Sequence, residues 1–223
     1  WRITYDGLGK MEMFKKWFRN VTVSHAYRST FTIGSYTTNL LYEDLDQDGF
    51  SDVTDQVGNF INEKQITSVS ITEQFSPLIM FDMTTKTDLL IKVELKRDRN
   101  LTLSLTNNQL TEIRGNEIVV GAGYDVRNVK IKFGASELES NLKVRADVSI
   151  RSNKTITRKL VENQNQVTAG QNLISIKTSA DYNLNQNLSI RFFFDRVVTK
   201  PFISTTFPTA NTNAGIALRF TLG

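Results

Sequence analysis

The chain lacks cysteine altogether, and it has only three prolines and one histidine. Without cysteine, disulfide bonds, thiol catalysis and thiolate metal sites are excluded. No apolar run reaches the roughly 18 residues of a membrane-spanning helix, which excludes a helical membrane protein. The chain begins at Trp1, with no basic segment followed by an apolar core. We therefore expect no signal peptide here, as in a mature or cut piece of a longer polypeptide.

Features of an enzyme or a nucleic-acid-binding protein are also scarce. A Ser/His/Asp triad would have to use His25, and the G-x-S-x-G elbow is missing. The glycine-rich stretch at 121–124 has no strand-to-helix context, so it does not indicate a phosphate loop. The 27 basic and 23 acidic residues are scattered along the chain without a Lys/Arg run. We expect neither enzymatic activity nor nucleic-acid binding.

The signal that recurs along the chain is an alternation of apolar and polar residues. In the segment 142–150 every second residue is apolar, from Leu142 to Ile150, and the residues between are charged or polar. Such a period of two predicts a β-strand with one apolar and one polar face. The same pattern recurs at 21–33, 69–83, 89–95, 101–105, 118–126, 174–184, 188–194 and 214–222. Polar residues 97–100 predict a hairpin turn between two of these segments.

The sequence thus predicts an all-β fold of about ten strands of roughly 9–17 residues, longer than the usual ~5–6 of globular sheets. Such lengths suit tilted strands that cross a bilayer, and the polar lumen of a membrane barrel explains a mean hydropathy of −0.28. Aromatic residues cluster near strand ends, where barrels place interfacial girdles. We expect an antiparallel transmembrane β-barrel architecture, with a soluble β-sandwich as the alternative that also alternates.

Two regions of different character divide the chain. Residues 1–20 contain apolar residues spaced by three to four, with basic residues between them, which predicts a short amphipathic helical segment at the periplasmic rim. Residues 21–223 hold the predicted barrel strands, with a long extracellular loop near 41–65 and further long loops around 133–141 and 199–211. Counting strands from that loop places the end of the chain in the periplasm, where outer-membrane barrels end.

The loop contains the string EDLDQDGFSDVTD, which has the spacing of a calcium site. Its acidic residues and one glycine fall at the offsets of an EF-hand-type loop, and hard oxygen ligands at that spacing can wrap one Ca²⁺. Asp replaces the usual Glu at the last position, and no flanking helices are predicted. An acidic turn without a metal is the alternative. The candidate ligands are Asp44, Asp46, Asp48, Phe50 through its carbonyl, Asp52 and Asp55.

Longer irregular strings carry a family resemblance. The stretches at 24–40 and 73–124, including NNQLTEIRGNE, and the end of the chain, including TANTNAGIALRFTL, resemble the carboxy-terminal part of the SprA/Sov family. The resemblance implies a giant outer-membrane β-barrel of about 36 strands, the translocon of the type IX secretion system in Bacteroidetes. It also implies export of folded cargo proteins that bear a carboxy-terminal signal, and a role in gliding motility in relatives.

The resemblance further implies a set of partners in the outer membrane of a Gram-negative bacterium. These are the remainder of the barrel, a PorV-type shuttle barrel that collects cargo, a plug protein, the secreted cargo and the surrounding lipid. No cofactor is expected beyond Ca²⁺ in the extracellular loop. Two further functions stay open: a stand-alone outer-membrane porin or receptor barrel, and a soluble calcium-binding β-sandwich.

Overall fold

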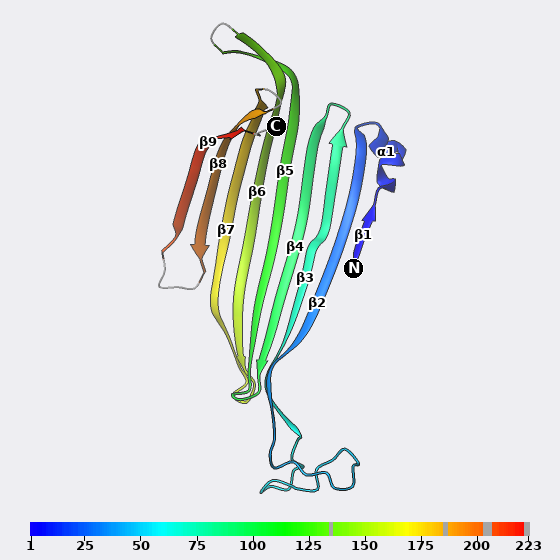
Figure 1. Ribbon diagram of the computed structural model, residues 1–223, viewed down its shortest axis with the longest axis vertical. Coiled ribbons are helices and arrows are strands. Elements are labelled where there is room, and N and C mark those ends of the chain that lie inside the picture. The colour runs from blue at the N-terminus through cyan, green and yellow to red at the C-terminus, as the bar shows by residue number, and fades with distance from the viewer. Residues whose placement is uncertain (134–135, 185–186, 203–206, 221–223) are drawn as a thin grey trace.

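The computed structural model describes residues 1–133, 136–184, 187–202 and 207–220, with the backbone alone at 131–133 and 136–138. Nine strands form one antiparallel sheet in which every strand pairs with its neighbours in sequence (Figure 1). The fold is therefore all-β, as the alternation predicts. The strands are β1 (Arg2–Tyr5), β2 (Phe18–Thr38), β3 (Lys64–Thr85), β4 (Leu89–Ser104), β5 (Gln109–Phe133), β6 (Ser136–Lys159), β7 (Gln164–Asn183), β8 (Leu188–Pro201) and β9 (Thr209–Phe220).

The predicted hairpin turn at 97–100 is wrong, because these residues lie inside β4. Arg97 pairs with Phe75 of β3 on one side and with Asn116 of β5 on the other. With hydrogen-bonding neighbours on both sides, polar side chains do not end a strand. Two predicted strands thus merge into one. Strand β1, in contrast, lies in the segment predicted to be helical and was not predicted, so the described part of the chain has nine strands where about ten were expected.

The N-terminal segment holds two short helical turns instead of one helix. A 3₁₀ turn, η1, covers Gly7–Lys10, and α1 covers Glu12–Lys15, between β1 and β2. Gly7 and Gly9 weaken helix formation by about 1 kcal/mol each relative to alanine, which favours the interruption. None of the helical segments described is long enough, or apolar enough, to cross a membrane.

The ends of the sheet differ in their connections. The long connection 39–63 lies at the same end as the tight turns after β4 and β6, whereas α1 lies at the opposite end (Figure 1). Since strands alternate in direction, β9 also ends at the α1 end, as the strand count predicts. Tight turns place Asp88, Asn108 and Asn163 at positive φ, a conformation that Asp and Asn tolerate.

A predicted loop near 133–141 is wrong in its described part, because β6 already begins at Ser136; residues 134–135 lie outside the described residues. The predicted loop at 199–211 is shorter than expected. Strand β8 continues to Pro201 and β9 begins at Thr209, and residues 203–206 lie outside the described residues.

Almost no apolar core exists in this sheet. Among the described residues, Val21 and Tyr182 are the only buried hydrophobic side chains. Tyr182 donates a hydrogen bond to the backbone carbonyl of Val129 at 3.0 Å, which satisfies its hydroxyl. Many of the large apolar side chains are exposed, because no second layer of structure lies against the sheet in the part of the chain that is described.

Candidate functional site

One face of the sheet carries an apolar stripe that continues from strand to strand. The register places apolar residues opposite one another in successive rows. One row joins Leu95, Ile118, Ile150 and Ile174, and the next joins Val93, Val120, Val148 and Ile176. Rows toward the α1 end continue through Tyr124 and Val144 and, on β8 and β9, through Phe192 and Ile216. We call this set of rows the apolar stripe.

On β5 the apolar stripe is the more exposed side of the sheet. On β5, Ile118 and Val120 are 52% and 49% exposed, whereas Gly121 and Gly123 on the other face are buried. A Cβ on Gly121 would approach the Asp147 carboxylate, so the small residues of the 121–124 stretch fit a crowded wall. This pattern is the reverse of a soluble sheet, which packs its apolar face inward.

The opposite face, which we call the charged face, carries charges of both signs paired with one another. Lys92 and Lys96 each contact the buried carboxylate of Glu94, at 2.9 and 3.6 Å. Arg151 contacts Asp98 at 2.7 Å and Glu117 at 3.6 Å. This network contains three cations, Lys92, Lys96 and Arg151, and three carboxylates, Glu94, Glu117 and Asp98, so its charges balance.

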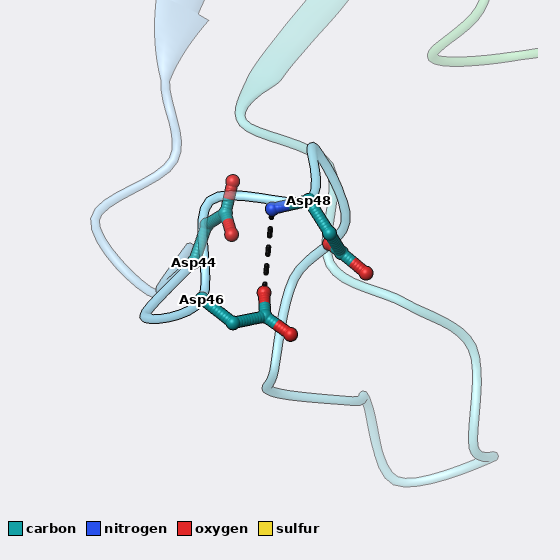
Figure 2. Close-up of side chains that lie close together, drawn as sticks. All are labelled: Asp44, Asp46 and Asp48. Carbon is teal, nitrogen blue, oxygen red and sulfur yellow. Dashed lines mark hydrogen bonds between the residues drawn. The ribbon is translucent and has the colours of Figure 1, made fainter.

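The acidic loop between β2 and β3 brings three of the predicted ligands together. The carboxylates of Asp44, Asp46 and Asp48 each offer an oxygen within 4.8 Å of the others (Figure 2). The N–H of Gly49 donates to Asp44 Oδ2 at 3.1 Å, and the N–H of Asp48 donates to Asp46 Oδ1 at 3.3 Å. Gly49 has φ +88°, which a residue with a side chain rarely adopts, so it permits the tight turn.

Asp44 Oδ1 is buried and has no hydrogen-bond partner within the described residues. Buried carboxylate oxygens are normally paired, so this atom indicates a missing donor or cation. Three carboxylates at this separation also repel one another, which a bound cation relieves. The donor set consists of hard oxygen atoms, which Ca²⁺ prefers.

The remaining predicted ligands are used elsewhere in the loop. Asp52 accepts a hydrogen bond from the N–H of Leu45 at 2.7 Å, which closes the turn. Asp55 lies in a separate turn, where its carboxylate accepts bonds from the Val57 and Asn59 N–H groups. The hydrogen bonds from Asn59, and then that from Val57, hold the pKa of Asp55 below its ordinary value.

The loop has a small structure of its own. Thr54 and Phe60 form an antiparallel bridge, and the rings of Phe50 and Phe60 lie 6.0 Å apart. The Phe50 N–H donates to Asp48. Burial, and next a hydrogen bond to Asp44, raise the pKa of the Tyr42 phenol. The loop is therefore organised around the three aspartates without the flanking helices of an EF-hand.

Sequence reasoning missed a second cluster of charges. Glu112 on β5 is fully buried beneath arginines from three strands. Residues 97–100 had been interpreted as a turn, so Arg99 was not placed in a strand beside β5. The signal was present in the sequence, because Arg97 and Arg99 keep the odd-numbered parity of Leu95 and Leu101. This parity predicts one continuous strand from Leu95 through Arg97 and Arg99 to Leu101.

The chain matches no family model and no curated protein.

Proposed function

We propose that this chain forms part of the wall of a large outer-membrane β-barrel that conducts folded proteins in type IX secretion. The observation that carries the proposal is the exposed apolar stripe, continuous over the strands of one sheet. Lipid acyl chains would cover this stripe, and the charged face would line a water-filled passage. The resemblance to the SprA/Sov family supplies the kind of cargo and the secretion system.

The solvent-exposed area of the chain supports the proposal that a bilayer covers one face of the sheet. The chain exposes 15883 Å². A folded monomeric protein of 25.3 kDa is expected to expose about 10,300 Å². The difference exceeds what a protein–protein interface of standard size buries from both partners together, ~1,600 Å². A bilayer around one side of the wall would cover such an area.

The height of the apolar stripe supports a membrane span. On β6 the stripe extends from Leu142 to Ile150, which corresponds to roughly 26–30 Å of strand. A strand tilted by about 40° then crosses about 20–23 Å, close to the ~25 Å apolar band of outer-membrane barrels. The polar ends of the long strands would extend beyond the bilayer.

The stripe also shifts along the sheet as tilted strands require. On β2 and β3 it reaches toward the acidic loop, to the pair Phe31 and Ile71. On β8 and β9 it lies toward the α1 end, with Leu188 opposite Phe220. A tilt of about 40° moves a horizontal band by roughly one residue per strand, in one direction across the sheet. The diagonal stripe is therefore compatible with one flat bilayer.

The wall needs further strands. Within the described residues β1 and β9 are at opposite borders of the sheet and do not pair with each other. Unpaired backbone groups in lipid cost several kcal/mol each, so the remainder of the barrel has to cover both borders. Barrel diameter grows roughly linearly with strand number, and passage of a folded domain needs a wide lumen. A PorV-type shuttle barrel, a plug protein and signal-bearing cargo are the partners that this proposal includes.

The acidic loop belongs to the same proposal as a Ca²⁺ site on the extracellular side. Asp44, Asp46 and Asp48 would supply the carboxylate oxygens, with the unpartnered Asp44 Oδ1 aimed at the ion. The ion would hold the connection between β2 and β3 in one conformation. Asp55 would not take part, because its own turn uses both of its carboxylate oxygens.

The proposal is tested by depleting the protein in the bacterium that encodes it. We expect the chain to fractionate with the outer membrane and to need detergent for extraction. We also expect proteins with a carboxy-terminal secretion signal to accumulate in the periplasm after depletion. A membrane barrel whose loss leaves their export intact would favour the stand-alone porin or receptor. A monomer that is extracted without detergent would instead favour the soluble calcium-binding sandwich.

A further inference from the structure

The buried carboxylate of Glu112 is the centre of a cluster of arginines. Arg99 Nε donates to Oε1 at 2.7 Å, and Arg114 Nε donates to the same atom at 2.5 Å. Arg114 Nη2 and Arg158 Nη2 donate to Oε2 at 3.0 and 2.8 Å. These arginines come from β4, β5 and β6, so one carboxylate fixes three guanidinium groups side by side.

The cluster lies on the same face as the apolar stripe. On β5 and β6 it lies at the border of the stripe, whereas on β3 and β4 the pair Glu73 and Arg99 interrupts the stripe before Ile71 and Leu101. Glu112 is opposite Leu101 of β4, and Arg114 is opposite Arg99. Along β5, Arg114 and Glu112 follow Ile118 toward the end of the sheet where the acidic loop lies. In a membrane barrel this border is the level at which acyl chains end and lipid head groups begin.

The cluster has more positive than negative charge. Its members are Arg97, Arg99, Arg114, Lys154 and Arg158, with Glu73 and Glu112 as the carboxylates; Lys154 is the cross-strand partner of Arg114, and Arg99 contacts Glu73 at 3.6 Å. Three arginines thus contact the two carboxylates, and Arg97 and Lys154 add two cations at neighbouring positions of the same face. The network on the charged face, by contrast, pairs three cations with three carboxylates. Mutual pairing therefore balances the network of Glu94, Glu117 and Asp98 but leaves positive charge in the cluster around Glu112.

The arginines also keep donors for another anion. Each guanidinium has five N–H donors, and Arg158 uses one and Arg114 two in the contacts with Glu112. Their side chains are 34% and 42% exposed. A guanidinium fork matches the geometry of a phosphate, and neighbouring fixed forks bind it without further loss of side-chain freedom.

We propose that this cluster binds the phosphate groups of a phosphorylated glycolipid, with the lipid's acyl chains lying on the apolar stripe below. The inference rests on the proposed function, because it needs the stripe to face a bilayer. Under that function the acidic loop faces outward, and the outer leaflet of such a membrane consists of phosphorylated glycolipid. The ligand is therefore a lipid head group rather than free phosphate.

The test uses the complete protein extracted from its membrane and washed free of lipid. Binding of lipid A, of phosphatidylglycerol and of inorganic phosphate is measured by native mass spectrometry and by calorimetry in detergent. The variant Arg114→Gln with Arg158→Gln removes two forks but leaves Arg99 on Glu112. The matched control, Lys96→Gln with Arg151→Gln, removes the same charge from the charged face of the same sheet.

We expect lipid A to bind about tenfold to a hundredfold more weakly to the Arg114/Arg158 variant and unchanged to the control. Unchanged binding by the first variant, or equal loss in both, overturns the inference. Equal occupancy by inorganic phosphate assigns the cluster to a soluble anion and also overturns it. Circular dichroism and heat-modifiable migration confirm that both variants are folded. If one is not, Arg158→Lys, which keeps the charge but loses the fork, is expected to show an intermediate loss.

Failure of the inference and failure of the proposed function give different results. A protein that inserts into lipid vesicles but does not distinguish lipid A contradicts only the lipid site. A protein that stays soluble and never inserts contradicts the membrane placement itself, whatever it binds.

Discussion

Asp44 has a carboxylate whose two oxygens differ: Oδ2 is hydrogen-bonded and Oδ1 is buried without a partner in the described part of the chain. Asp46 and Asp48 complete the group. If the loop binds Ca²⁺, Asp44→Asn should weaken binding by at least about tenfold, since it removes a charged ligand. Asp55→Asn is the control and should leave the affinity unchanged. Calcium calorimetry on the complete protein checks both.

The protease sensitivity of the loop gives a second test of calcium binding by the three aspartates. We expect a chelator to expose the connection 39–63 to proteolysis in the wild-type protein, and to add nothing in Asp44→Asn. Equal cleavage with and without chelator in the wild-type protein would contradict the calcium site.

At the scale of a strand, Val119 and Val120 are neighbours on β5 that face opposite sides. Val120 pairs with Val93 and Val148 in the apolar stripe, whereas Val119 lies between Glu94 and Ser149 on the charged face. Val120→Arg should cost about 2–4 kcal/mol of unfolding free energy, because a cation at the middle of a bilayer is poorly solvated. Val119→Arg gains Glu94 as a neighbour and should cost much less.

The measurement is the urea unfolding of both variants in lipid vesicles. Equal losses for Val119→Arg and Val120→Arg would show that the two faces meet similar surroundings. The stripe would then not face lipid.

Alternation predicts the strands best where the two faces differ in polarity. The segment 142–150 lies in β6 and is predicted from parity alone. The polar extensions of β4 through 97–100, and of β6 to Lys159, have no such contrast and were missed. The Glu112 cluster was missed for a related reason, because Arg99 and Arg158 are 13 and 46 residues from Glu112 in sequence. Only the register brings them together.

At the scale of the whole molecule, the sequence predicts an antiparallel sheet, and the structure has one. The resemblance and the strand lengths predict a barrel, and this stays a prediction, since pairing of β9 with a further strand depends on residues outside this chain. The three aspartates were predicted together because they are close in sequence, so a local turn gathers them. Asp55 was grouped with them by spacing, and in the structure its carboxylate accepts hydrogen bonds from Val57 and Asn59 in a separate turn.

The free border of β9 gives a test of the missing strands. In the isolated chain, the amides of β9 that point away from β8 should exchange with deuterium within seconds, because no carbonyl protects them. If the chain is part of a larger outer-membrane barrel, as proposed, the same amides should be protected there by a neighbouring strand. Fast exchange in both states would contradict a continued wall, and amides of β6 serve as the protected reference in both.

The strand order also determines how this molecule can be made. Since each strand pairs only with its immediate neighbours in the chain, every new hairpin can dock on the one before it without waiting for distant segments. The sheet can therefore form by adding one hairpin after another, and each step closes only a short loop of the chain. If the chain is part of a barrel, as proposed, the joining of the two outermost borders of the complete barrel is the one step that has to close long sequence separations at once.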